Sequence, residues 1–210
     1  MKIGILGWGS LIWKPGKLRL KSKWHVTGPM LPIDFGRKSI DGRLTLVICP
    51  DRELMRTYWA MSAAESLQEA TDDLWKREGH PYKKYICSIK ASAAPQSEVE
   101  KVLHAWITEL NKNGIQLDAA IWTALPPKRS TTEGEEFPSD DEAIKYLRTL
   151  DGDALDLARE YITHAPKFID TSLRRKIEKE LGWMRVPLDN ELFEPEAAND
   201  SQGPEDGEQG

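Results

Sequence analysis

The sequence predicts an α+β fold, built as a small mixed or antiparallel β-barrel with flanking helices and an extra helical segment near the C-terminus. Three observations predict it. Short apolar runs separated by turn signals fill the N-terminal part, which is typical of strands. Segments with helix-capping patterns interrupt the later strands. The region at about 139–182 carries helical patterns alone. Strands first and helices later is the order of an α+β domain.

The N-terminal part is expected to consist mainly of strands. The apolar run at residues 2–7 predicts a buried strand, and a loop is expected over 8–23. The Asp41-Gly42 pair predicts a hairpin turn between two of the strands that follow. These strands are expected at about 24–36, 43–49 and 54–61.

Helices are predicted from capping signals and apolar periodicity. The segment Ser66-Leu67-Gln68-Glu69 has capping-box spacing, and a helix is expected from it to about Arg77 or Glu78, where Gly79 stops it. An amphipathic helix is expected at 97–112. Strands are expected on either side of it, at 82–90 and 117–122. The helical extension is expected at about 139–150, 153–164 and 171–181.

The charge of the chain is unevenly distributed. The net charge is −5, yet residues 189–210 hold eight acidic residues and no lysine or arginine. The remaining 26 acidic and 29 basic residues give residues 1–188 a net charge of +3. We therefore expect one domain over 1–188 and a disordered acidic tail over 189–210, whose partner the sequence does not reveal. A nucleic-acid-binding protein is expected to carry a cluster of basic residues on one face, and the sequence shows no such cluster. We therefore expect no nucleic-acid partner.

Several classes of protein do not fit the composition. No apolar run approaches the ~20 residues of a membrane span, and residues 1–6 are too short for the core of a signal peptide. We expect a cytoplasmic protein with no membrane partner. Cys49, Cys87 and the four histidines show no metal-ligand spacing, so no metal site is predicted.

One carboxylic acid is placed by helix geometry on an apolar face. Leu67, Ala70, Leu74 and Glu78 share one face of the predicted helix. Because three of them are apolar, the face is expected to turn toward the core and to withdraw Glu78 partly from water. A carboxylate in such a place suits general acid–base catalysis. There are two alternatives: fraying of the helix end turns Glu78 outward, or Glu78 forms a structural ion pair with Arg77, Lys83 or Arg37.

A glycine-rich loop follows the first strand directly, in the order Gly7-Trp8-Gly9-Ser10-Leu11. Glycine permits close approach of the backbone, so free N–H groups there can hold a carboxylate or carbonyl oxygen. A dinucleotide fingerprint would need a third glycine and an immediate helix, and a phosphate-binding Walker loop would need Gly-Lys-Ser/Thr. The alternative is a tight turn without a ligand.

These pieces together resemble the γ-glutamylcyclotransferase family, including its ChaC-like members. The loop at 7–11 resembles the family's Tyr-Gly-Ser-Leu/Asn loop, which also follows the first strand. Ile33-Asp34-Phe35-Gly36 and the next strand look like its second signature region. Residues 74–79 look like its Leu-x-x-x-Glu-Gly segment, which places the catalytic glutamate at Glu78. The resemblance covers about residues 2–125.

The resemblance implies a small barrel and a reaction without cofactors. The α-amine of a γ-glutamyl amine, amino acid or peptide attacks its own γ-carbonyl and releases 5-oxoproline. The amides around Gly9, Ser10 and Leu11 would hold the substrate and stabilise the oxyanion, while Glu78 would move the proton. Some members place a pocket tyrosine at Tyr85, whereas Tyr82 matches the ChaC-like branch, and both stay open.

The chain departs from the family at Trp8, which stands where the loop usually has tyrosine and so removes a hydroxyl. Arg37 and Lys38 either bind a substrate carboxylate or form a solvated strand end. A second reading of the whole chain is a non-catalytic module that binds a small molecule. A hydrolase with Ser10 as its nucleophile is a third, although no histidine or aspartate stands in a triad arrangement.

Overall fold

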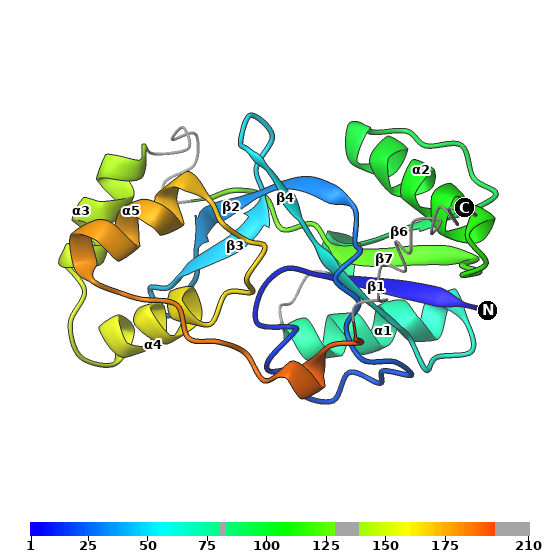
Figure 1. Cartoon of the computed structure of the whole chain (residues 1–210), viewed down its shortest axis with the longest axis horizontal. Coiled ribbons are helices and arrows are strands. Elements are labelled where there is room, and N and C mark those ends of the chain that lie inside the picture. The colour runs from blue at the N-terminus through cyan, green and yellow to red at the C-terminus, as the bar shows by residue number, and fades with distance from the viewer. Residues whose placement is uncertain (80–82, 129–138, 196–210) are drawn as a thin grey trace, which may run out of the picture.

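The computed structural model describes residues 1–79, 83–128 and 139–195. In this part of the chain it has a mixed α+β architecture of five α-helices and two β-sheets (Figure 1). The α+β class predicted from the sequence is therefore confirmed. The strands of the described residues pair as two separate sheets, and no closed barrel is found among them.

The larger sheet has four strands in the order β5-β1-β7-β6. The central strand β1 (Ile3–Gly7) is buried at all five positions, as a strand covered on both faces must be. It runs parallel to β7 (Ala119–Thr123) and antiparallel to β5 (Tyr58–Met61), and β6 (Ile86–Lys90) pairs with the far side of β7. The predicted strand at 82–90 thus begins later, because residues Lys83–Tyr85 form a 3₁₀ turn.

Two helices cover opposite faces of this sheet (Figure 1). Helix α1 (Leu67–Glu78) packs beneath β6 and β7, and α2 (Glu98–Lys112) packs on the other face. Helix α1 begins and ends where the sequence predicts. Ser66 caps its start by accepting a hydrogen bond from the Glu69 N–H at 3.2 Å, and Gly79 ends it with a φ of 67°.

The smaller sheet has the order β3-β2-β4, with β3 at Leu44–Ile48, β2 at Met30–Lys38 and β4 at Leu54–Arg56. The predicted hairpin turn joins β2 to β3, and Gly42 adopts a φ of 86° there. The predicted strand at 54–61 divides at Thr57 instead, so that β4 and β5 lie in different sheets. Thr57 is buried, and its N–H and hydroxyl both donate to the Pro29 carbonyl, which fixes this crossing.

The three helices of the C-terminal extension gather beside the smaller sheet (Figure 1). They are α3 (Asp140–Arg148), α4 (Gly152–Thr163) and α5 (Ser172–Leu181), each close to its predicted range. Ser139 and Glu142 complete the predicted capping box of α3. Helix α4 packs against β3, and α3 packs against α5. None of the helices in the described residues is long and apolar enough to cross a membrane.

The chain stays ordered beyond the predicted boundary at residue 188. A 3₁₀ turn covers Asn190–Leu192, and the backbone of Trp24 bonds to the Leu192 carbonyl at 2.8 Å and to the Glu194 N–H at 2.9 Å. The Phe193 ring lies 5.6 Å from the Tyr58 ring. Packing of this partly buried side chain against the core explains why residues 189–194 belong to the domain. Residues 196–210, the rest of the predicted tail, lie outside the described residues.

Candidate functional site

A cavity of about 230 Å³ brings the glycine-rich loop and Glu78 together. Its walls come from five parts of the fold: the end of β1 with the loop after it, the β2–β3 hairpin, the C-terminal end of α1, the end of β7 with the residues after it, and helix α4. All five residues of the predicted loop, Gly7, Trp8, Gly9, Ser10 and Leu11, line it. The glycine-rich loop and the end of α1, two regions distant in the sequence, therefore line one cavity.

The loop folds as a tight turn that leaves backbone donors unused. The Ile12 N–H donates to the Gly9 carbonyl at 3.0 Å, and the Lys14 N–H donates to the Ser10 carbonyl at 2.8 Å. The N–H groups of Gly9, Ser10 and Leu11 have no acceptor among the described residues. Successive unpaired N–H groups beside a cavity form a site suited to an anion or a polarised carbonyl oxygen.

Glu78 is the last residue of α1, and its side chain is 17 % exposed at the cavity wall. Its Oε1 lies 3.0 Å from Nη1 of Arg77, so one of the ion pairs considered from the sequence is present. Arg77 also donates to the Ser10 hydroxyl at 3.2 Å and to the Lys14 carbonyl at 2.8 Å. This arginine therefore fixes the end of α1, and Glu78 with it, against the loop.

Two further arginines make the cavity cationic. Arg43 lines the cavity, and its positive charge is balanced by Asp41, since Nη2 of Arg43 lies 2.6 Å from Oδ2 of Asp41. Arg37 donates to the Pro126 carbonyl at 3.0 Å, and it has no carboxylate partner within the described part of the chain. An unpaired guanidinium at the wall of a cavity is a natural partner for a ligand carboxylate. Lys38 lies over the Tyr146 ring instead, 4.3 Å from its centroid, and does not line the cavity.

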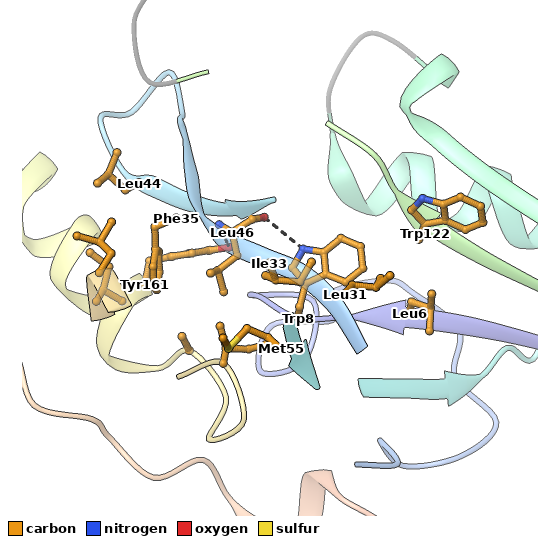
Figure 2. Close-up of a cluster of buried hydrophobic side chains, with 14 of the residues drawn as sticks. Leu6, Trp8, Leu31, Ile33, Phe35, Leu44, Leu46, Met55, Trp122 and Tyr161 are labelled. Atoms are coloured by element: carbon orange, nitrogen blue, oxygen red, sulfur yellow. Dashed lines mark hydrogen bonds between the residues drawn. The ribbon is translucent and has the colours of Figure 1, made fainter. Parts of the chain in front are cut away.

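Trp8 contributes one wall of the cavity and is otherwise part of the core. It is 6 % exposed, and its indole Nε1 donates to the Leu46 carbonyl at 3.3 Å. Figure 2 shows the indole on one side of Leu46 and the Tyr161 side chain on the other. The one polar side-chain atom of Trp8 is therefore bound to the backbone of β3.

Tyr161 is a cavity residue that sequence reasoning missed. It comes from α4, is 7 % exposed, and its hydroxyl oxygen accepts a hydrogen bond from the Leu46 N–H at 3.3 Å (Figure 2). Burial raises the pKa of Tyr161 to about 12, and the negative charge of Glu78 acts in the same direction. Apolar periodicity assigns Tyr161 to a buried helix face, but no local signal connects it with a loop so distant in the sequence.

Of the two tyrosines proposed as pocket residues, Tyr85 alone lies within the part of the chain that the structure describes. Tyr85 is half-buried at the end of the 3₁₀ turn before β6, and it is not among the described residues that line the cavity. Tyr82 lies outside the described residues. No group of three histidine, cysteine or acidic side chains in the described part of the chain is arranged to hold a metal ion.

A larger hollow of about 780 Å³ lies at the C-terminal segment. Its walls are mainly apolar and include Tyr58, Phe168, Leu188 and Phe193. Neither Glu78 nor the glycine-rich loop reaches it. Because chemistry needs a titratable group beside oriented donors, the smaller cavity is the better candidate despite its size.

Comparison of the chain with protein-family models, with curated proteins and with solved structures found no match.

Proposed function

We propose that the protein is a γ-glutamylcyclotransferase-like enzyme, which releases 5-oxoproline from a γ-glutamyl amine, amino acid or peptide. One observation carries the proposal: Glu78 lines the same cavity as Gly9, Ser10 and Leu11, whose N–H groups have no acceptor among the described residues. Intramolecular acyl transfer requires a base and a set of oxyanion donors at one small space.

The reaction needs no cofactor. The α-nitrogen of the γ-glutamyl group forms a bond to the γ-carbonyl carbon, and the bond from that carbon to the leaving nitrogen breaks. Overall the α-ammonium loses two protons and the leaving nitrogen gains two, so the amine departs as an ammonium ion. Glu78 would accept a proton from the α-nitrogen and deliver it to the leaving nitrogen. The loop amides would stabilise the negative charge that develops on the carbonyl oxygen.

The charges of the cavity suit this substrate. A γ-glutamyl group carries an α-ammonium beside an α-carboxylate. Glu78 would bind the ammonium, and Arg37 would bind the carboxylate because its guanidinium has no acidic partner in the described residues. Holding both charged groups folds the chain back on itself, which brings the nitrogen to the carbonyl carbon and lowers the entropic cost of ring closure.

The proposal brings with it the finer features of the family. These are a small β-barrel, a cytoplasmic location and a small-molecule substrate rather than a nucleic acid or a membrane. The competing proposal is a non-catalytic module that binds a small molecule in the same cavity. The Arg77–Glu78 ion pair favours it, since a carboxylate held by an arginine can serve structure alone.

The test is release of 5-oxoproline from a panel of γ-glutamyl amino acids, γ-glutamyl amines and glutathione. The native chain is compared with Glu78→Gln and with Glu98→Gln, a control on α2 whose side chain is 87 % exposed. Turnover that Glu78→Gln abolishes and Glu98→Gln retains supports the proposal. Turnover that survives in Glu78→Gln would support the proposed activity but refute the role of Glu78 as its acid–base group. No turnover by folded native protein favours the binding module.

A further inference from the structure

The hydroxyl of Tyr161 reaches the glycine-rich loop from a part of the chain that does not resemble the family. Helix α4 lies beyond residues 2–125, which carry the resemblance. A Cβ atom built on Gly9 would fall 2.5 Å from the Tyr161 hydroxyl oxygen, so this oxygen lies directly against the backbone of Gly9. The Gly9 N–H is one of the three proposed oxyanion donors, and the hydroxyl is therefore their neighbour.

The surroundings hold the phenol ring in place. The Trp13 ring meets it edge-on at 5.5 Å, and the Phe35 ring does so at 6.5 Å. The Arg43 guanidinium lies over its face, 5.6 Å from the centroid. A donor fixed before the substrate arrives needs no reorganisation during the reaction, which is the condition for effective stabilisation of a transition state.

The Tyr161 hydroxyl donates no hydrogen bond to the described residues. A phenol group donates one hydrogen bond and can also accept. The Tyr161 oxygen accepts from the Leu46 N–H, whereas its own hydrogen has no acceptor among the described residues. Since the group lines the cavity, a ligand atom in that space can accept this hydrogen bond.

We propose that Tyr161 is a catalytic residue whose hydroxyl donates a hydrogen bond to the γ-carbonyl oxygen of the substrate as negative charge develops there. The inference rests on the proposed function and adds a fourth donor to the amides of Gly9, Ser10 and Leu11. Tyr161 also supplies the cavity with a hydroxyl group, which Trp8 lacks. The one polar side-chain atom of Trp8, the indole Nε1, already donates to the Leu46 carbonyl. The proton stays on the phenol throughout, so the balance of the reaction is unchanged.

The test compares two tyrosine-to-phenylalanine variants that lose the same kind of protein contact. Tyr161→Phe removes the proposed donor. Tyr58→Phe is the matched control, because Tyr58 is also buried and also accepts one backbone N–H, from Phe168 at 3.1 Å, but it does not line the cavity. For both variants kcat and KM for 5-oxoproline release are measured with thermal unfolding, at a temperature below both unfolding midpoints.

We expect kcat of Tyr161→Phe to fall by about 10²-fold, the usual effect of removing one oxyanion donor, while KM changes by less than about threefold. Tyr58→Phe should keep the native kcat. A native kcat in Tyr161→Phe, or an equal loss in both variants, would overturn the role of Tyr161 and leave the proposed function standing. No turnover by the native chain would instead remove the proposed function and this inference with it.

Discussion

The hydroxyl of Tyr161 and the backbone of Gly9 are in such close contact that residue 9 has no space for a side chain. A Cβ at this position would lie 2.5 Å from the hydroxyl oxygen but 3.5 Å from the ring carbon Cζ that bears it. The hydroxyl alone therefore forces residue 9 to be glycine. This contact joins the N-terminal loop to the C-terminal helical extension, and it gives a prediction that does not depend on any activity.

Gly9→Ala is expected to lower the free energy of unfolding by about 1–3 kcal/mol, as overpacking of a filled interior does. In a Tyr161→Phe background the same change should cost less than about 1 kcal/mol, because Cζ lies at ordinary contact distance. Denaturant unfolding of the four proteins in this cycle measures the coupling.

Gly7→Ala is the matched control for this cycle. A Cβ on Gly7 would lie 2.9 Å from Cη2 and Cζ3 of Trp24. Gly7→Ala should therefore lower the free energy of unfolding by the same amount in the native and Tyr161→Phe backgrounds. Equal costs of Gly9→Ala in both backgrounds would contradict the contact.

Arg37→Gln is expected to raise KM for a γ-glutamyl substrate by about 10-fold or more, the effect of losing one charge-assisted hydrogen bond. Its kcat should change little, since the carboxylate is bound equally in the ground and transition states. Arg56→Gln on β4 is the control, because Arg56 is exposed and does not line the cavity. A KM that stays native in Arg37→Gln would show that another group binds the carboxylate.

Arg77→Gln is expected to lower both stability and turnover. The side chain connects Glu78, the Ser10 hydroxyl and the Lys14 carbonyl, so its loss should cost about 1–3 kcal/mol in unfolding free energy. Turnover should fall at least about tenfold, because Glu78 and the loop lose their common anchor. The neighbouring Lys76 is exposed, and Lys76→Gln should change stability by less than about 0.5 kcal/mol. Equal effects of the two substitutions would contradict the anchoring role.

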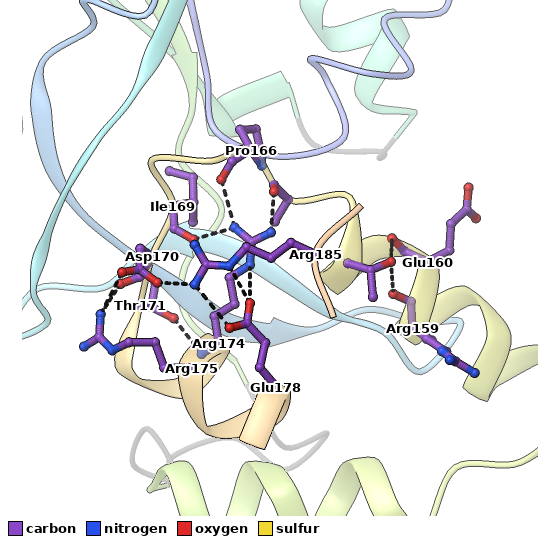
Figure 3. Close-up of polar contacts among 12 residues, drawn as sticks. Arg159, Glu160, Pro166, Ile169, Asp170, Thr171, Arg174, Arg175, Glu178 and Arg185 are labelled. Atoms are coloured by element: carbon purple, nitrogen blue, oxygen red, sulfur yellow. Dashed lines mark hydrogen bonds and ion pairs between the residues drawn. The ribbon is translucent and has the colours of Figure 1, made fainter. Parts of the chain in front are cut away.

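Arg174 is expected to be a major determinant of stability at the C-terminal extension. It is 1 % exposed and donates to the carbonyls of Ala165, Pro166 and Ile169 at 2.6–2.8 Å (Figure 3). Arg174→Met leaves these acceptors without that donor and should lower the free energy of unfolding by about 3 kcal/mol.

Lysine should not rescue position 174, because one ammonium group cannot reproduce the fork of a guanidinium. The adjacent Arg175 is the control: its side chain is 48 % exposed, and Arg175→Met should cost less than about 1 kcal/mol. Chemical denaturation checks each variant, and similar losses for the two arginines would refute the assignment.

His25 is expected to make stability depend on pH. Burial lowers the pKa of His25, while the charge of Glu194 opposes that shift, and the ring is stacked on Trp59 at 4.1 Å. Because the folded-state pKa is below the unfolded value, the unfolded chain takes up the proton first as the pH falls. The contribution of neutral His25 to the free energy of unfolding is thus complete above about pH 6.5. It is lost as the pH falls through the folded-state pKa of His25.

Thermal unfolding of the native chain and of His25→Gln between pH 7.5 and about pH 5 checks this expectation. The native midpoint should decline more steeply than that of the variant. Parallel curves would show that His25 does not contribute to the slope.

The local structure around the candidate site could largely be read from the sequence. Ser66 and Gly79 define the limits of α1, and the apolar positions at Ala70 and Leu74 turn Glu78 inward. Capping residues and apolar periodicity act within a few turns of the chain, so the sequence alone determines them. For the same reason the helices of the extension were predicted close to their observed ranges, and the hairpin turn at Gly42 was correct.

Only the tertiary structure decided how these pieces meet. The run at 54–61 reads as one strand, yet Thr57 bonds to Pro29 and divides it between two sheets. The order of residues 189–194 depends on the cover that Tyr58 gives to Phe193. The approach of Tyr161 to Gly9 joins residues at opposite ends of the domain. Apolar periodicity specifies that a side chain is buried but not against which partner, because that choice is made by packing between elements distant in the sequence.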